Sequence, residues 1–172
     1  MTQKVAHYML QRIKVYNQFT TKWCSMFAIA HALAIMFKEQ YKDVVVNPYS
    51  IVRLAFLHKG FRVILNRAMG IQEIMAALQE YGLWVKLDGK RTKIFPGSLI
   101  EISEKELKQY LGKRPILATG SKIVHSMVLI GVYPENPVEY VVVDSASRKG
   151  YSHVNQSYFN RYFIIFNYST NE

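Results

Sequence analysis

The single cysteine of this 172-residue chain, Cys24, is the side chain best suited to nucleophilic chemistry. It begins an apolar segment that predicts a buried helix, and the partial positive charge of a helix N-terminus stabilises a thiolate. Two later segments with strand character carry polar groups at their ends, because His125 opens the first and Asp144 closes the second. A histidine beside a thiol can hold it as a thiolate and protonate a leaving amine, while a carboxylate orients the imidazole. We therefore predict that Cys24, His125 and Asp144 are catalytic residues.

Gln18 lies six residues before Cys24 and completes this set. A tetrahedral intermediate carries negative charge on its oxygen, to which an amide side chain and the backbone N–H of Cys24 could donate hydrogen bonds. Gln18 is therefore the predicted oxyanion donor. The alternative for a lone cysteine is a small buried hydrophobic residue without a chemical role. His31 lies two helical turns after Cys24, roughly 10 Å along the axis, and is interpreted as a buried structural or polar-paired histidine.

Four segments have the periodicity or the end signals of helices. Apolar residues surround the segment 24–42 on all sides until Lys38, which predicts a central helix buried on every face. Asn47 and Pro48 mark the start of a second helix, and Ser103 begins a segment with the pattern of a capping box. We expect helices over residues 24–42, 49–58, 71–81 and about 103–111.

After Gly82 the pattern changes to short apolar runs separated by turn residues, which is typical of strands. Helices followed by strands predict an α+β protein, with a long central helix starting at Cys24 in a helical half and an antiparallel β half. One domain is the default at this length, and we assign 1–172 to it, with a helical subdomain over about 20–82 and a β subdomain over about 83–168. We expect strands over residues 83–87, 114–119, 125–133, 139–144 and 162–167.

Several segments follow, in order, the motifs of one enzyme family. Gln18 and Cys24, with Phe27 and Ala28 after them, form the pattern Gln-x5-Cys-x-x-Phe-Ala. A histidine strand with a trailing Gly-x-Tyr and a strand ending in Asp-Ser come later in the chain. These motifs resemble the nucleophile segment, the histidine strand and the strand of the orienting residue in papain-like cysteine peptidases. Aspartate stands here where that family usually has asparagine, as is typical of the related bacteriocin-processing peptidases, and the Cys-Gly-Ser-Cys-Trp signature is absent.

The resemblance implies a papain-like fold and hydrolysis of peptide or amide bonds through a thioester acyl-enzyme, without a cofactor. It also implies a substrate cleft, because the segment at Gly70 is similar to the Gly-Gly segment that lines the family's cleft. We assign Trp23, Gly70 and Ser126 to substrate binding. Trp23 is adjacent to the thiol and could belong to the core instead. Transfer to an amine rather than to water stays open, since the shape of the cleft selects the acceptor.

The chain is strongly basic, because 22 lysine and arginine residues outnumber 12 aspartate and glutamate residues and give a formal net charge of +10. Such a charge attracts nucleic acid, anionic lipid or acidic proteins. The basic residues are scattered along the chain, and no nucleic-acid-binding motif accompanies them. The alternative to a peptidase is therefore a catalytically silent papain-fold module that binds an anionic partner through a basic surface, for example in a virus or phage particle.

Composition also excludes several classes of protein. One cysteine excludes an intrachain disulfide and a cysteine-rich zinc site, and the five histidines have no metal-ligand spacing, so we expect no metal. The sequence has no apolar run long enough for a transmembrane helix, and its first residues lack the pattern of a signal peptide. We therefore expect a cytoplasmic or virion-associated protein.

Overall fold

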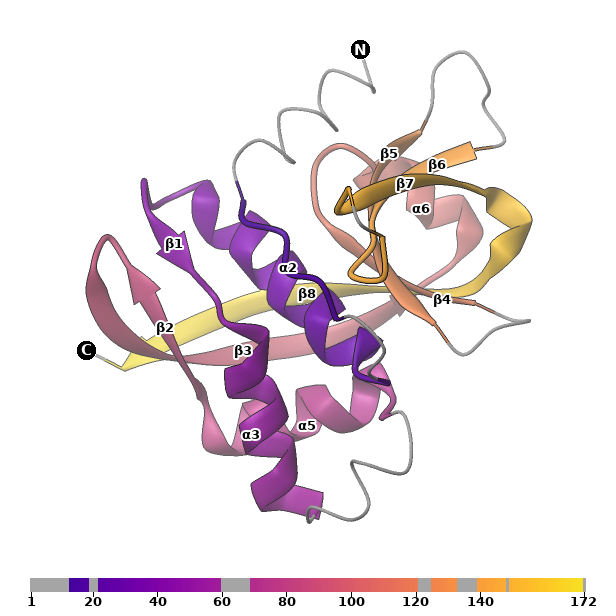
Figure 1. The fold of residues 1–172 in the computed structure, drawn as a ribbon. Helices are drawn as coiled ribbons and strands as arrows, with labels where there is room; N and C mark the ends of the chain where they lie inside the picture. Colours follow the sequence, from indigo (N-terminus) through magenta and orange to yellow (C-terminus); the bar gives the residue numbers. More distant parts are fainter. Residues whose placement is uncertain are drawn as a thin grey trace.

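The computed structural model describes residues 13–18, 22–59, 69–120, 125–132, 139–147 and 149–171 (Figure 1). These residues form a mixed α+β fold in which helices pack against a curled antiparallel sheet, so the predicted fold class is confirmed at this level. The described helices are α2 (Cys24–Lys38), α3 (Pro48–Lys59), α5 (Ile71–Tyr81), α6 (Glu104–Tyr110) and the short 3-10 helix η1 (Gln156–Tyr158).

The described strands form one eight-stranded sheet in the order β1-β2-β3-β8-β4-β5-β6-β7, with antiparallel pairing between neighbours. The long strands β3 and β8 run side by side through its middle, and the part formed by β4 to β7 curls away from them (Figure 1). The strands are β1 (Val44–Val45), β2 (Leu83–Leu87), β3 (Lys90–Ile102), β4 (Ile116–Gly120), β5 (Ser126–Val132), β6 (Glu139–Val143), β7 (Tyr151–Asn155) and β8 (Phe159–Asn171).

Two hydrophobic clusters lie on opposite faces of the curled part of the sheet. The first lies between this sheet and the helices α2, α3 and α5, and it includes Leu117 and Val128. The second contains Leu107 of α6 together with the neighbouring residues Ile116 and Leu129. Successive side chains of a strand point to opposite faces, so β4 and β5 contribute to both clusters. The sheet is therefore covered by apolar packing on both sides where it supports α2.

Helix α2 is the buried central helix that the sequence predicts. Of its 15 residues 13 are buried, and its hydrophobic residues pack against α3, α5 and strand β5. The helix ends at Lys38 rather than continuing to Lys42, because the apolar run stops at Phe37 and the next residues, Glu39 and Gln40, are exposed. Cys24 is the first residue of α2, so the fold places the thiol at the N-terminus of its most buried helix.

The other predicted elements agree with the structure to within a few residues, with some exceptions. The predicted helix over 71–81 and the capping box at Ser103 are confirmed, the latter by hydrogen bonds in both directions between Ser103 and Glu106. Strands β3 and β7 were not predicted, and β8 is longer than the predicted strand over 162–167. The last residue of the predicted strand 125–133 lies outside the described residues. The division into two subdomains stays a prediction.

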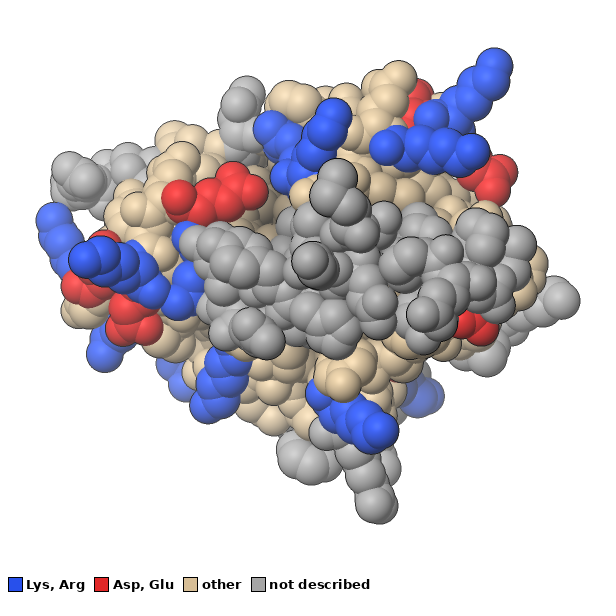
Figure 2. All heavy atoms as spheres, turned by 90° about the horizontal axis from the view of Figure 1, so that it is seen from above, with Lys and Arg blue, Asp and Glu red and all other residues tan. Residues whose placement is uncertain are grey.

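Charge is distributed over the surface rather than gathered in one patch on the face seen in Figure 2. Lysine and arginine side chains lie in several separate groups on that face, and acidic side chains lie beside some of these groups. Along the described part of the chain, no helix is both long and apolar enough to cross a membrane.

His31 is fully enclosed between α2 and the segment 13–18. Its side chain is 1% exposed, its Nε2 accepts a hydrogen bond of 2.9 Å from the backbone N–H of Tyr16, and the Tyr16 ring stacks on it. Burial lowers the pKa of His31 to about 4. The imidazole is therefore neutral at pH 7, and this agrees with the prediction of a buried structural histidine.

We expect the neutral state of His31 to make the protein sensitive to acid. The unfolded chain takes up a proton on this histidine below its ordinary pKa of about 6.5, whereas the folded chain resists it down to about 4. The free energy of unfolding should fall by about 2 kcal/mol between pH 7 and pH 5 on this account alone. His31→Gln keeps an acceptor for Tyr16 without titrating, so urea unfolding at both pH values should show a smaller loss in the variant. An equal loss in both proteins would contradict this assignment.

Candidate active site

Cys24 lines a small pocket. Its side chain is 4% exposed, and the first turn of α2 behind it is fixed by a hydrogen bond of 3.1 Å from the Phe27 N–H to the Trp23 carbonyl. The pocket has a volume of about 150 Å³, and its described lining consists of Cys24, Met69, Gly70, Ile71, Thr119, Gly120, His125 and Ser126. A bound carbonyl group could therefore approach the thiol through this pocket.

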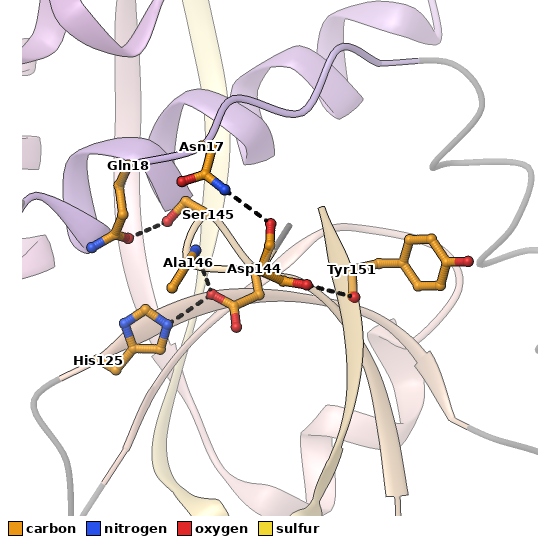
Figure 3. A network of polar contacts seen from close by, with 8 residues as sticks. Asn17, Gln18, His125, Asp144, Ser145, Ala146 and Tyr151 are labelled. Carbon is orange, nitrogen blue, oxygen red and sulfur yellow. Dashed lines mark hydrogen bonds and ion pairs between the residues drawn. The ribbon is translucent and has the colours of Figure 1, made fainter. Parts of the chain in front are cut away.

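The pairing of β5 with β6 brings His125 and Asp144 together. β5 begins directly after His125, β6 ends directly before Asp144, and Val128 pairs with Val143 across the two antiparallel strands. Nε2 of His125 lies 2.8 Å from Oδ1 of Asp144 (Figure 3). The same oxygen accepts a hydrogen bond of 2.9 Å from the backbone N–H of Ala146, which fixes the carboxylate. The orienting contact predicted from the sequence is therefore present.

A hydrogen bond joins the Cys24 thiol to the His125 imidazole. Burial alone raises the pKa of Cys24, but three lowering effects together outweigh it: the hydrogen bond with His125, the backbone N–H groups of Ser126 and Ser25, and the positive charge on His125. The pKa of Cys24 therefore lies below its ordinary value. This is the direction that a nucleophilic cysteine requires.

The opposite shift occurs at His125. Burial alone lowers the pKa of this imidazole, but the hydrogen bonds with Asp144 and Cys24 raise it to about 9. Burial also acts to raise the pKa of Asp144, but the hydrogen bonds from His125 and the Ala146 N–H lower it below its ordinary range. A thiolate on Cys24, an imidazolium on His125 and a carboxylate on Asp144 are thus mutually stabilising at neutral pH.

The predicted oxyanion donor, Gln18, is fastened to the turn that carries Asp144. Its backbone N–H donates a hydrogen bond of 2.8 Å to the Ser145 carbonyl, and the Ser145 hydroxyl donates to its Oε1. The amide nitrogen of Gln18 points away from Ser145 (Figure 3). A third link runs from Nδ2 of Asn17 to the Ser147 carbonyl at 3.2 Å. Three hydrogen bonds therefore join the segment before α2 and the turn after β6 into one frame.

Gly150 allows the segment 13–18 to pack closely against the turn after β6. It has a positive φ of 77°, which favours glycine, and a Cβ atom there would approach Cγ1 of Val15 to 2.9 Å. Any larger residue would push the segment 13–18 away from the turn and so displace Gln18.

The three residues predicted to bind substrate differ in their placement. Gly70 and Ser126 line the pocket of Cys24. Gly70 is the N-cap of α5, and a Cβ atom there would meet nothing within 4 Å, so this wall is open. Trp23 is not among the described lining residues, and its ring instead packs edge-on against Tyr49 and Phe56 at centroid distances of 6.5 and 6.2 Å.

Several residues of the site were not predicted. Thr119 and Gly120 form one wall, because Thr119 pairs with Ser126 and the Gly120 N–H donates a hydrogen bond of 3.1 Å to the His125 carbonyl. A hairpin alignment of the two predicted strands 114–119 and 125–133 could have placed them there. Ser25 fixes the opposite wall, since its hydroxyl donates to the Met69 carbonyl. Among the residues that the structure describes, no group of three or more metal-ligating side chains occurs.

Comparison of the sequence with protein-family models gave no match, and comparison with curated proteins gave no significant match either.

Proposed function

We propose that this protein is a papain-like cysteine peptidase that hydrolyses peptide or amide bonds through a Cys24–His125–Asp144 triad. The observation that supports the proposal best is the arrangement of the three side chains. The thiol at the helix N-terminus is hydrogen-bonded to His125, His125 is held by Asp144 at 2.8 Å, and the thiol faces a pocket of about 150 Å³. A structural cysteine needs neither the charged partner nor the pocket.

The first half of the reaction is acylation. The Cys24 thiolate attacks the substrate carbonyl carbon, and the pair of electrons moves onto the carbonyl oxygen, where the Cys24 N–H and the Gln18 amide stabilise it. The His125 imidazolium then gives its proton to the leaving nitrogen, the C–N bond breaks, and a thioester forms on Cys24. Asp144 keeps the ring of His125 in position and favours its charged form.

The second half is deacylation. Neutral His125 removes a proton from water as the water oxygen attacks the thioester carbonyl. The tetrahedral intermediate collapses, the C–S bond breaks, and the carboxylic acid product leaves with Cys24 restored as thiolate and His125 as imidazolium. The same site would transfer the acyl group to an amine if the amine reached the thioester before water.

The pH dependence of alkylation tests this proposal. Iodoacetamide reacts with a thiolate, so in the native protein Cys24 should react at pH values well below the ordinary thiol pKa of about 8.5. In His125→Ala the hydrogen bond and the positive charge of His125 are lost while burial remains, so the rate at pH 7 should fall at least about tenfold. His153→Ala, which removes an exposed histidine of β7, is the matched control and should leave the rate unchanged.

Hydrolysis should also decline on the alkaline side. His125 loses its proton at about pH 9, and acylation then lacks its general acid, whereas alkylation of the thiolate continues. A Cys24 that reacts slowly, with a midpoint near pH 8.5 in both the native protein and His125→Ala, would overturn the proposal. It would favour the alternative of a catalytically silent module.

A further inference from the structure

A second and larger cavity lies away from Cys24, between helix α3 and the strands β2 and β3. Its volume is about 530 Å³. We call it the basic groove, and its described lining consists of Val45, Asn47, Ser50, Arg53, Leu54, Leu57, Tyr81, Gly82, Leu83, Trp84, Val85, Lys86, Arg91 and Lys93.

Exposed apolar side chains gather at the basic groove. Leu57 is 81% exposed and Trp84 is 43% exposed. Seven large hydrophobic residues are exposed in the described part of the chain, and four of them line this groove. These four are Leu57, Trp84, Val45 and Tyr81. An apolar patch of this kind, bordered by polar residues, is typical of a surface that binds another molecule.

The charged side chains among the described residues that line the basic groove are all positive. Arg53, Lys86, Arg91 and Lys93 line it, and none of the described lining residues is acidic. The guanidinium of Arg91 lies 3.9 Å from the centroid of the Trp84 ring, and Nζ of Lys93 lies 5.7 Å from it. This charge contrasts with the mixed signs on the face shown in Figure 2. A ligand that complements the groove is therefore negatively charged.

Helix α5 connects the basic groove to the pocket of Cys24. Its first residue, Ile71, and its N-cap, Gly70, line the pocket, whereas its last residue, Tyr81, and the following Gly82 line the groove. Eleven helical residues at 1.5 Å each span about 16 Å. An extended chain rises about 3.3 Å per residue, so about five residues bridge that distance.

We propose that the basic groove binds an acidic segment of the protein substrate, which anchors an apolar side chain in the groove at least about five residues from the bond to be cleaved. This proposal rests on the proposed peptidase function. The aliphatic wall formed by Leu54, Leu57 and Val85 accepts a leucine-like or phenylalanine-like side chain, while the four cations pair with neighbouring carboxylates. Binding of single-stranded nucleic acid relies on open aromatic faces, and Arg91 already covers one face of Trp84.

Binding can be measured without turnover, in the 172-residue chain that carries Cys24→Ala. The probe is a fluorescein-labelled peptide of about ten residues that alternates Asp or Glu with Leu or Phe, and the readout is fluorescence anisotropy. Arg53→Glu combined with Lys86→Glu reverses two exposed charges of the groove and should weaken binding at least about tenfold. Lys105→Glu combined with Lys108→Glu on α6 makes the same change in net charge outside the groove, and should weaken binding less than about twofold.

Three outcomes would overturn the assignment of the basic groove. The first is equal weakening by the two double variants, since only net charge would then matter. The second is binding that persists unchanged in Arg53→Glu with Lys86→Glu. The third is tight, groove-dependent binding of oligo(dT) without binding of the acidic peptide.

Kinetics of the otherwise native enzyme complete the test. With a substrate that carries the acidic segment, the groove double variant should raise KM and leave kcat unchanged, and with a substrate lacking that segment it should change neither. This result separates the two proposals, because alkylation of Cys24 does not depend on the groove. An activated Cys24 with an unchanged KM for the acidic substrate would overturn the groove alone. An unreactive Cys24 would overturn the peptidase itself.

Discussion

Cys24→Ala is expected to lower the rate of peptide hydrolysis by a factor on the order of 10⁴ or more, because covalent catalysis loses its nucleophile. The substitution removes one sulfur atom at the first position of α2, where alanine suits a helix. The thermal midpoint should therefore stay close to that of the native protein. The measurement is kcat/KM on a peptide substrate together with a melting curve of each protein.

The other members of the triad should give a graded series. His125→Ala removes the proton donor and also the contacts that keep Cys24 ionised, so its loss should approach that of Cys24→Ala. Asp144→Ala leaves the imidazole in place without its orienting partner, so it should cost less than His125→Ala.

Asp144→Asn is the variant of this series that separates the charge of Asp144 from its hydrogen bonds. Its side-chain oxygen can still accept from Nε2 of His125 and from the Ala146 N–H, while the negative charge is lost. The imidazolium carries a proton on both nitrogens, so the neutral partner does not impose a wrong tautomer. We expect a smaller loss than in Asp144→Ala and an alkaline limb shifted to lower pH. Native activity in Cys24→Ala, or a larger loss in Asp144→Asn than in His125→Ala, would contradict the mechanism.

The proximity of the candidate catalytic residues His125 and Asp144 could be predicted from sequence, because their positions follow from the order of the elements. Cys24 begins an apolar run and therefore a helix, while His125 and Asp144 lie at the ends of consecutive apolar strands. Consecutive strands of an antiparallel sheet are commonly neighbours, which brings the start of one and the end of the next together. The contacts of Trp23 do not follow in this way. They depend on the position of α3, because its residues Tyr49 and Phe56 contact the Trp23 ring.

Strand β3 was not predicted, because Pro96 and Gly97 lie within it and such residues normally interrupt strands. The pairing explains why they are tolerated. β2 pairs with β3 from Lys90 only as far as Ile94, so the later residues of β3 pair only with β8. Pro96 therefore lies where β2 no longer pairs with the strand, so its missing N–H interrupts no pairing with β2. β7 was missed for another reason, since its alternation of exposed and half-buried residues is largely polar.

Gln18→Ala is expected to lower kcat by about 10² to 10³, which is typical of losing one donor to an oxyanion. The rate of Cys24 alkylation at pH 7 should stay unchanged, because Gln18 is not among the groups that set the pKa of Cys24. Gln18→Glu should be at least as damaging, since a carboxylate would repel the developing negative charge. Ser145→Ala removes the hydroxyl that holds Oε1 of Gln18, and should cause a smaller fall in kcat.

Asn17→Ala provides the matched control for Gln18. It breaks the neighbouring link from the same segment to the Ser147 carbonyl, yet it removes no group assigned to the oxyanion. If the segment 13–18 acted only as a structural brace, Asn17→Ala and Gln18→Ala would lower kcat and the thermal midpoint together. If Gln18 stabilises the oxyanion, only Gln18→Ala lowers kcat strongly, and alkylation stays at the native rate in both. Parallel losses of alkylation and hydrolysis in Gln18→Ala would show that the residue supports the triad rather than the intermediate.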